Sequence, residues 1–389
     1  MDGRSIGAGF KAKRECLADP ANVAKLLSST NTEELPPIEQ DVVVVYQRKP
    51  KKILICSSKT EDAVINARQE VLKHVMEVLD CVVVVHDCFL PVVEAETHRL
   101  WGVVYNPGTN IPSEPEKEEK ELCELQTDDV ELIIAIGGDG TILKVIKMFP
   151  HVIPPVIGLS MGSMGYLAKF NMDQVKETLS GITEHGLTVS RRRLLHVEIY
   201  DQDDQLIARR NALNECVVDR GISPYIATLD VYYQGSYFTT VTGDGLLIST
   251  PSGSTAYSMA AGGPIVHPVV SSMLFTVICP HSISFRPVVL PSDSVLDIII
   301  PADNRAPVRV CVDGNYDCEL QQGCHLKITT SSIAFPLVLP NNTRTGEEWN
   351  RALKNHLHWN HRVRQQPMQT PAEVPSMHPG IKQKEHDSQ

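Results

Sequence analysis

The chain has 389 residues, of which 42% are hydrophobic and 21% are charged, and its formal net charge at pH 7 is −11. This composition excludes a disordered or fibrous chain and leaves room for two globular domains. The negative charge argues against nucleic acid as a partner, so an anionic ligand would need locally placed Arg or Lys side chains and a divalent cation.

Ten cysteines occur without a single C-x-x-C pair. This pattern points away from zinc and redox motifs and favours a reducing compartment. No apolar stretch approaches the roughly 20 residues of a membrane helix, and the first twenty residues lack the apolar region of a secretory signal. We therefore expect a cytoplasmic protein without a membrane partner.

The N-terminal part of the chain is expected to be a flexible tail followed by an α/β domain. Residues 1–40 are polar and end in a Leu-Pro-Pro turn, which predicts the tail. From residue 41 to 190, short apolar runs alternate with a helical pattern, which is typical of a parallel sheet. Strands are expected at 42–45, 53–55, 82–85, 132–136 and 156–157, and a helix is expected over 64–79. The acidic stretch 114–131 predicts a solvated loop and an exposed helix.

The most informative motif is Gly-Gly-Asp-Gly-Thr at residues 137–141, directly after the apolar run 132–136. Glycines allow the backbone to approach a polyphosphate closely, and a helix expected to begin near Thr141 would point its free N–H groups at the same place. A tight turn in which Asp139 merely caps that helix is the alternative. Two glycines before the acid and one after it are more than a capped turn requires, so we favour a phosphate-transfer site at the carboxyl edge of the sheet.

From about residue 191 the apolar pattern changes to period two, as at 196–200, 229–233 and 308–312. With glycine turns between such runs, this predicts a mainly antiparallel β domain over 191–338. A C-terminal helix is expected within 339–365, and residues 366–389 have the composition of a disordered tail.

A second polar constellation covers residues 242–268, where hydroxyl groups and glycines are dense. Asp244 lies between two glycines, as Asp139 does. Ser254 and Thr255 are expected to cap a helix from Ala256 to Ala261, whose N-terminus would suit an anionic or polar group. A capped helix in a Gly/Ser-rich loop is the alternative, and it leaves Asp244 unexplained.

Other polar residues are less informative. Four cations are considered for phosphate contacts, with a solvated face as an equal alternative. They are Lys169, Arg191, Arg192 and Arg193. Three histidines near the C-terminus lack nearby Cys or acid ligands, so an exposed helix is favoured over a metal site. They are His356, His358 and His361.

Taken together, these motifs resemble those of the NAD kinases, most closely the animal-type cytosolic members. The resemblance covers most of residues 50–365. Besides the two constellations above, it rests on Gly-Ser-Met-Gly-Tyr-Leu at 162–167, Asn-Glu at 214–215 and His-Ser-Ile-Ser-Phe-Arg-Pro at 281–287. The Gly-Gly-Asp-Gly-Thr motif alone is shared with lipid kinases and resembles that of phosphofructokinases.

The resemblance implies a Rossmann-like or phosphofructokinase-like parallel α/β domain with the nucleotide site, followed by an all-β NAD-binding domain. It implies transfer of the γ-phosphoryl group of ATP to the 2′-hydroxyl of the adenosine ribose of NAD, which gives NADP. It also implies that Mg²⁺, or another divalent cation, arrives with ATP rather than in a protein metal site, and that the chain forms a homo-oligomer.

The resemblance also assigns roles to residues. Asp139 would be the catalytic carboxylate that accepts the proton of the 2′-hydroxyl, and Gly140 would leave room beside it. The implied NAD contacts are Tyr166 and Leu167 at the adenine, Asn214 and Glu215 at the ribose, Asp244 on the nicotinamide side, and Thr255, Ala256, Tyr257, Ser258, Met259 and Ala260 around the adenosine. Tyr225, Asn315 and Arg193 are further candidates at the edge of the pocket, where the chain departs from the family pattern.

Two other functions remain open at this point. A lipid kinase of the diacylglycerol or sphingosine type would share the glycine turn, but it should carry a membrane-facing element, and none is evident. A catalytically silent nucleotide sensor would result from loss of a key acid, whereas Asp139, Asn214, Glu215 and Asp244 are all present.

Overall fold

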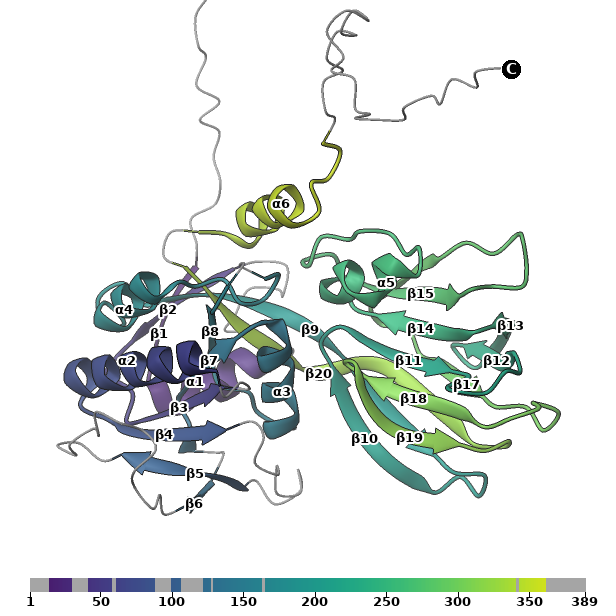
Figure 1. Cartoon of the computed structure of the whole chain (residues 1–389), viewed down its shortest axis with the longest axis horizontal. Coiled ribbons are helices and arrows are strands. Elements are labelled where there is room, and N and C mark those ends of the chain that lie inside the picture. Colours follow the sequence, from purple (N-terminus) through teal and green to yellow (C-terminus); the bar gives the residue numbers. More distant parts are fainter. Residues whose placement is uncertain are drawn as a thin grey trace, which may run out of the picture.

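The computed structural model describes residues 14–29, 41–57, 61–87, 99–105, 122–126, 129–162, 165–340 and 343–361. Two lobes are joined by a pair of long strands, β9 (Leu187–Tyr200) and β20 (His325–Leu339), and Figure 1 shows both strands crossing from one lobe to the other. The first lobe is a mostly parallel α/β structure and the second contains an all-antiparallel sheet. The predicted fold class is confirmed.

The first lobe is built on four parallel strands in the spatial order β4–β3–β7–β8. Their bounds are β3 (Lys52–Ser57), β4 (Val82–Asp87), β7 (Leu132–Gly137) and β8 (Val156–Ser160). The order reverses between β3 and β7, because β4 lies on one side of β3 and β7 on the other. Open α/β sheets bind ligands at such a reversal, outside the carboxyl ends of the strands.

Helices cover both faces of this sheet. One face packs against α1 (Pro20–Ser28), α2 (Asp62–Leu79) and α4 (Met172–Ser180) through Ile53, Ile55 and Ile134. The other face packs against α3 (Asp139–Met148) through Leu54 and Ile133. Successive strand residues point to opposite faces. The apolar runs therefore supply both cores.

The N-terminal segment differs from its prediction. Part of the expected flexible tail forms β1 (Arg14–Ala18) and α1, and β1 pairs in parallel with β2 (Val42–Tyr46). Helix α1 begins because Asp19 caps it and Pro20 occupies its first position, and it is held by the fully buried Val23 and Leu27. Residues 1–13 and 30–40 lie outside the described part of the chain.

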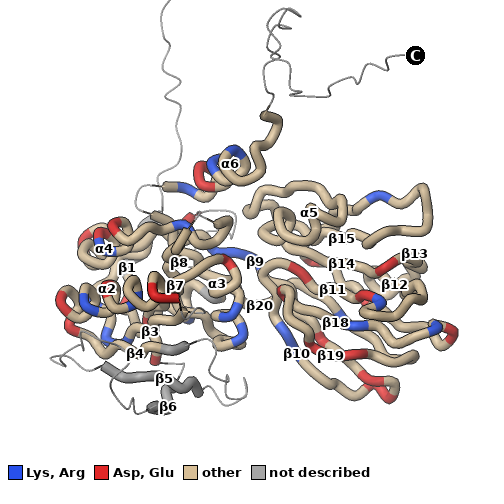
Figure 2. Tube along the Cα trace, in the orientation of Figure 1, with Lys and Arg blue, Asp and Glu red and all other residues tan. Residues whose placement is uncertain are grey.

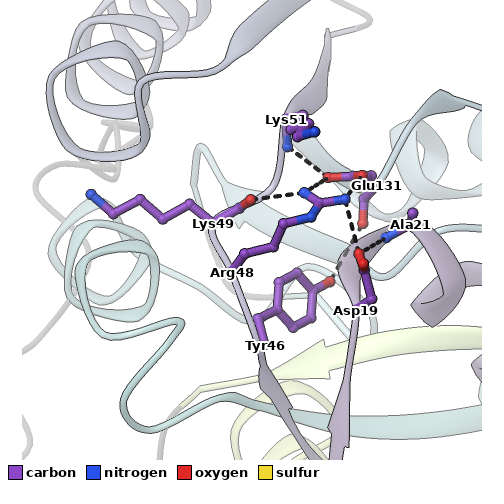
Figure 3. A network of polar contacts seen from close by, with 7 residues as sticks. All are labelled: Asp19, Ala21, Tyr46, Arg48, Lys49, Lys51 and Glu131. Atoms are coloured by element: carbon purple, nitrogen blue, oxygen red, sulfur yellow. Dashed lines mark hydrogen bonds and ion pairs between the residues drawn. The ribbon is translucent and has the colours of Figure 1, made fainter.

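A polar network fixes this segment to the sheet at the amino ends of the strands (Figure 3). Glu131, which is 6% exposed, accepts hydrogen bonds from both terminal nitrogens of Arg48, at 3.2 and 2.7 Å, and from the backbone amide of Lys51 at 2.6 Å. Arg48 also pairs with Asp19 at 2.9 Å. The network lies just before β7, at the opposite end of that strand from Asp139, so we assign it to structure.

The structure of the acidic stretch 114–131 also differs in part from its prediction. Residues 122–126 form strand β6 (Leu122–Gln126), which pairs with β5 (Arg99–Tyr105) beyond β4, where a loop and an exposed helix were expected. Residues 114–121 and 127–128 of this stretch are not described.

The second lobe packs two sheets face to face. One is the six-stranded antiparallel sheet β16–β15–β14–β11–β18–β19, and the other is the far part of the sheet that contains β9 and β20. The core between them includes Val197, Leu229, Leu246, Phe275 and Val310, all at most 1% exposed. The remaining strands of this lobe are β10 (Leu206–Ala212), β11 (Glu215–Asp219), β12 (Ala227–Tyr233), β13 (Ser236–Gly243), β14 (Gly245–Ser249), β15 (Ser272–Ile278), β16 (Val288–Pro291), β17 (Leu296–Ile299), β18 (Val308–Val312) and β19 (Asn315–Leu320).

Two of the glycine turns expected between period-two runs form β-hairpins, between β12 and β13 and between β18 and β19. Their turns carry left-handed residues, Gln234 and Gly235 in the first and Asp313 and Gly314 in the second. Paired left-handed residues match the twist of the flanking strands.

The junction between the lobes lies inside β9 and β20. The domain boundary predicted near residue 191 falls within β9, which continues to Tyr200 without a break. The register of β20 against β9 shifts between Thr330 and Ala334, opposite the stretch at Leu194. Figure 2 shows basic residues on β9 where it passes between the lobes.

The last described helix is α6 (Thr345–His356), which lies within the range 339–365 expected for a C-terminal helix. It ends because His358 and Asn360 adopt left-handed backbone angles. Its first residue is tied to the first lobe, since the Thr345 amide donates to Asp41 Oδ2 at 2.8 Å. In the described part of the chain, no helix is both long enough and apolar enough to cross a bilayer.

Candidate functional site

Asp139 is the first residue of α3 and follows the carboxyl end of β7, so the helix begins two residues earlier than expected. Its carboxylate accepts three backbone hydrogen bonds. The Tyr166 amide donates to Oδ2 at 2.9 Å, and the Leu167 and Ala168 amides donate to Oδ1 at 3.0 Å each. These bonds connect two segments of the site that are 27 to 29 residues apart in the chain.

The glycines around Asp139 fall into two kinds. A Cβ added at Gly138, Gly140 or Gly162 would have no heavy atom within 4 Å, so open space lies beside each of them. A Cβ at Gly165 would lie only 2.1 Å from Asp139 Oδ1. The first kind leaves room for a ligand, and the second allows the carboxylate to reach the amides of residues 166–168.

Tyr166 lies between the two lobes and α6. Its hydroxyl is buried without a hydrogen-bond partner among the described residues, and its ring centroid is 5.4 Å from that of His356. Leu167 is 5% exposed and packs in the core under α3. Residues 163 and 164 of the same motif are not described.

Asn214 and Glu215 are held by a second aspartate. Asp313 Oδ2 accepts from the Leu213 amide at 2.8 Å, and its Oδ1 accepts from the Asn214 and Glu215 amides at 2.7 and 3.2 Å. Burial raises the pKa of Asp313 to about 6, although these three hydrogen bonds oppose the rise. The start of β11 is thereby fixed to the end of β18.

Glu215 is a buried carboxyl group, 6% exposed. Burial raises its pKa to about 7, the nearby Asp313 raises it further, and a hydrogen bond from the Tyr257 backbone amide opposes both effects. Its Oε2 atom is buried and has no hydrogen-bond partner within the described chain. A buried polar atom without a partner is costly, so this oxygen is suited to a donor on a ligand.

Asp244, just before β14, forms an ion pair within the second lobe. Arg220 Nε lies 2.6 Å from Asp244 Oδ1, and the Arg220 amide also donates to the Asp244 carbonyl at 3.0 Å. Hydrogen bonding to Arg220 lowers the pKa of Asp244 below its usual range. Asp244 is therefore an anchored anion, with its side chain 40% exposed.

The segment predicted to be one capped helix is instead two short pieces. A 3₁₀ turn spans Ser252–Thr255, and the four-residue helix α5 spans Tyr257–Ala260. Ser254 does not cap a helix, because its hydroxyl donates to the Pro251 carbonyl at 2.7 Å and accepts from the Val266 amide at 3.0 Å. A helix this short offers no strong N-terminal anion site, which corrects that part of the expectation.

The predicted residues of this segment face different surroundings. Tyr257 is 41% exposed, whereas Ser258 is fully buried and its hydroxyl has no partner among the described residues. Thr255, Ala256 and Met259 are partly buried and Ala260 is exposed. Ser258 alone among these residues is fully buried, so it cannot meet a ligand without rearrangement.

Two cavities border α6, the smaller one lined by residues of both lobes and the larger one by residues of the first lobe and α6. The smaller one, of about 20 Å³, brings Tyr166 and Leu167 together with Thr255. The larger one, of about 340 Å³, extends from the glycines beside Asp139 to α6. Its lining residues are Gly162, Gly165, Lys169, Glu348, Arg351, Ala352, Asn355 and His356.

The three candidates at the edge of the pocket, Tyr225, Asn315 and Arg193, line neither cavity. Tyr225 is 49% exposed, with the Arg305 guanidinium 6.0 Å from its ring centroid. The Asn315 side chain donates to the Asp313 carbonyl at 2.9 Å, and Arg193 donates to Ser271 Oγ at 2.6 Å. These contacts are internal to the second lobe or its junction.

Sequence reasoning missed the contribution of α6. The helix was expected to be exposed, but Glu348 is 2% exposed and Trp349, Arg351 and His356 reach the cavities. The Trp349 ring lies edge-on to His267, with ring centroids 4.8 Å apart. The spacing of Trp349, Ala352 and Leu353 on one helical face was the available signal.

Within the described residues, no group of three or more His, Cys, Asp and Glu side chains could hold a metal ion. The acid at the glycine turn already accepts three amide hydrogen bonds.

Comparisons with known proteins agree with this geometry. A sequence model of the ATP-NAD kinase N-terminal domain matches residues 20–187, and one of the ATP-NAD kinase C-terminal domain matches residues 213–339. Together they cover well over half of the chain.

Two relatives show the degree of similarity. The chain is 39% identical over 242 residues to "NAD kinase 2, chloroplastic" of Arabidopsis thaliana, covering 61% of this chain and 24% of that protein. It is 36% identical over 249 residues to "NAD(+) kinase" of Saccharomyces cerevisiae, covering 60% of this chain and 46% of that protein. The chain thus spans about a quarter of the plant relative and about half of the yeast relative.

Two solved structures share the fold. Yeast NADH kinase complexed with NADH superposes with a TM-score of 0.71 and 25% identity, over 90% of this chain and 100% of that one. An NAD kinase from Archaeoglobus fulgidus in complex with ATP has a TM-score of 0.53 and 21% identity, over 78% and 98% of the two chains, and this likeness concerns the fold alone.

Proposed function

Since this chain belongs to the ATP-NAD kinase family, we propose that it transfers the γ-phosphoryl group of ATP to the 2′-hydroxyl of the adenosine ribose of NAD. In this reaction the 2′-oxygen bonds to the γ-phosphorus, and the bond from that phosphorus to the bridging oxygen of ADP breaks. The hydroxyl loses its proton, and the products are NADP and ADP. The observation that carries the proposal is the fixed carboxylate of Asp139, which lies beside open space and next to a cavity between the first lobe and α6.

The hydrogen bonds of Asp139 support one of its oxygens as the proton acceptor. A carboxylate offers about four lone-pair positions, two on each oxygen. Oδ1 already accepts from two amides, whereas Oδ2 accepts from the Tyr166 amide alone. Oδ2 therefore keeps one position for the 2′-hydroxyl. General-base assistance of this kind contributes on the order of 10²–10⁴ in rate, and positioning supplies the rest.

Magnesium, or another divalent cation, belongs to the proposal as a companion of ATP. It would neutralise charge on the phosphates during transfer. Its ligands would be phosphate oxygens and water, because the described side chains offer no metal cluster.

The NAD side of the site follows from the second lobe. The buried, unpaired Oε2 of Glu215 suits a ribose hydroxyl donor, and the exposed ring of Tyr257 suits stacking against a base. Thr255 shares a cavity with Tyr166 and Leu167, which supports an adenosine bound between the lobes. The yeast structural relative was solved with NADH, which supports a dinucleotide as the substrate class.

Further parts of the proposal concern the state of the protein in the cell. We include animal-type cytosolic membership and a cytoplasmic location, supported by the free cysteines among the described residues. A homo-oligomer is supported by apolar side chains exposed on the second lobe, such as Ile222 and Ile283. Light scattering of the purified protein measures the assembly directly.

The activity itself is tested with the purified chain, Mg-ATP and NAD. NADP formed is measured by cycling with glucose-6-phosphate dehydrogenase. Diacylglycerol is offered in a parallel reaction. NADP formation supports the proposal, and phosphorylation of the lipid without NADP formation would replace it with the lipid-kinase alternative.

A further inference from the structure

The charged groups facing the larger cavity leave one cation unpaired. Lys169 is 4% exposed, and among the described residues its ammonium has no hydrogen-bond or ion-pair partner within 4 Å. Its nearest specific contact is the Tyr166 ring, whose centroid is 6.0 Å away. A buried, unpaired ammonium is unfavourable, and burial accordingly lowers the pKa of Lys169 to about 8.

The groups around Lys169 come from three elements. Glu348 and Arg351 belong to α6, Arg192 belongs to β9, and Asp139 belongs to α3. Glu348, the largest of the opposing influences, is already paired with Arg351 at 2.8 Å. Arg192 is 4% exposed and its Nε atom has no partner among the described residues. The two carboxylates therefore leave an excess of positive charge on this side of the cavity.

The position of the cavity restricts what can enter it. Gly162 and Gly165 form its wall opposite α6, and Gly165 is in contact with the Asp139 carboxylate. A group bound there is adjacent to the proposed proton acceptor, which is where the donor phosphate must lie for in-line transfer. A volume of about 340 Å³ is large enough for a triphosphate.

We propose that this cavity holds the triphosphate of ATP, that Lys169 binds a phosphate oxygen directly, and that α6 closes the site with Arg351. The inference rests on the proposed function, and it selects Lys169 from the four cations considered in the sequence. Arg193 contacts Ser271 instead, and Arg191 donates to the Ser29 carbonyl at 3.2 Å. Glu348 then acts as a placeholder for phosphate, since its carboxylate pairs with Arg351 and exerts the largest opposing charge effect on Lys169 from beyond ion-pair distance.

The key variant is Lys169→Met, which keeps the apolar stem and removes the charge. Loss of a buried unpaired charge does not threaten folding. Hydrogen bonds to charged groups are worth about 1.5–3 kcal/mol, so the KM for ATP should rise about 10- to 100-fold with the KM for NAD unchanged. Lys169→Arg should restore most of the ATP affinity. Lys73→Met, at an exposed lysine on α2, is the matched control and should change neither constant.

A second variant should shift the KM for ATP in the opposite direction. Glu348→Gln removes the competing carboxylate, so the KM for ATP should fall. A purely structural role of Lys169 would not produce opposite shifts in these two variants. Equal changes in the KM values for ATP and NAD in Lys169→Met, or none in either, would overturn the inference.

A binding measurement separates this inference from the proposed function. Calorimetric titration with Mg-ATP, and separately with magnesium tripolyphosphate, is carried out without NAD. Weaker binding of both probes to Lys169→Met supports the phosphate site even if no NADP is ever formed. Unchanged binding of both probes refutes the site, even if the chain proves to be an active NAD kinase.

Discussion

Asp139 and Asp313 hold their neighbouring loops in the same way, each accepting hydrogen bonds from three consecutive backbone amides. Asp139 holds residues 166–168 of the first lobe, and Asp313 holds residues 213–215 of the second. Each lobe thus presents a site segment whose position depends on one carboxylate. The two differ in surroundings, because Asp313 is 7% exposed whereas Asp139 borders open space.

The first prediction concerns the proton acceptor. Asp139→Asn should reduce kcat by about 10²–10⁴, because the amide cannot accept the proton and its NH₂ group faces a backbone N–H. NAD binding, measured by calorimetry, should be retained. Asp173→Asn, at an exposed position in the first turn of α4, is the control. An unchanged kcat in Asp139→Asn would exclude the assigned role.

The second prediction concerns Gly165. In Gly165→Ala the new methyl group would lie 2.1 Å from Asp139 Oδ1, so the carboxylate must leave its amide partners. We expect a loss of about 1–3 kcal/mol in the free energy of unfolding and a large fall in kcat. Both are measured on the same preparation, by urea unfolding and by initial rates.

Gly140→Ala is the matched comparison for that experiment. The new Cβ meets nothing within 4 Å, and Gly140 lies within α3. The free energy of unfolding should rise by about 0.5–1 kcal/mol, since alanine is favoured over glycine in a helix. Nucleotide binding should nevertheless weaken, because the methyl group fills space assigned to the ligand. Destabilisation of Gly140→Ala would contradict the open geometry.

The third prediction concerns pH. The pKa of Glu215 is raised from 4.5 to about 7, so the folded protein holds this proton more tightly than the unfolded chain does. The resulting stability is fully present below pH 4.5 and is lost as the pH rises through 7. Asp313, with its pKa raised to about 6, adds an effect of the same sign at lower pH.

Glu215→Gln should remove the Glu215 part of this dependence. At pH 8 the variant should be more stable than the native protein by about 3 kcal/mol, and near pH 4.5 the two should be similar. Urea unfolding at a series of pH values measures this, with the exposed Glu184→Gln as the control. Parallel stability curves for native protein and Glu215→Gln would show that Glu215 is not responsible.

The fourth prediction distinguishes a direct contact between Asp244 and NAD from a purely structural role of the ion pair between Asp244 and Arg220. Asp244→Ala should raise the KM for NAD more than the KM for ATP, as expected for a group on the nicotinamide side. Arg220→Ala leaves the Asp244 carboxylate in place and should raise the KM for NAD less. If both variants raise it equally, the ion pair at 2.6 Å is structural and Asp244 does not contact NAD.

The parts of the fold predicted from the sequence are those whose signal is local. The buried strands β3, β4, β7 and β8 are continuous apolar runs, and period-two patterns marked the hairpins of the second lobe. The position of the strand-to-helix turn after β7 was predicted correctly, because its glycines and its acid are adjacent in the chain, whereas its role in phosphate transfer stays a prediction.

The rest depends on contacts between distant segments. Helix α1 is only nine residues long, and its stability comes from packing Val23 and Leu27 against a sheet that a local pattern does not reveal. The same holds for α6, whose Glu348 is buried only because the first lobe lies beneath it. The hydrogen bonds of Asp139 likewise reach residues far away in the sequence. The burial of Lys169 and Arg192 also depends on segments that are distant in the chain.

The continuity of β9 and β20 has a consequence for how the protein is made. One end of each strand packs in the core of the first lobe, and the other end packs in the core of the second lobe. A chain cut near residue 191 or 331 would therefore leave both cores with an unpaired strand edge. The halves should therefore aggregate when expressed separately. Since β20 comes from the end of the described fold, the α/β core should also remain incomplete during synthesis until residues beyond 339 have left the ribosome.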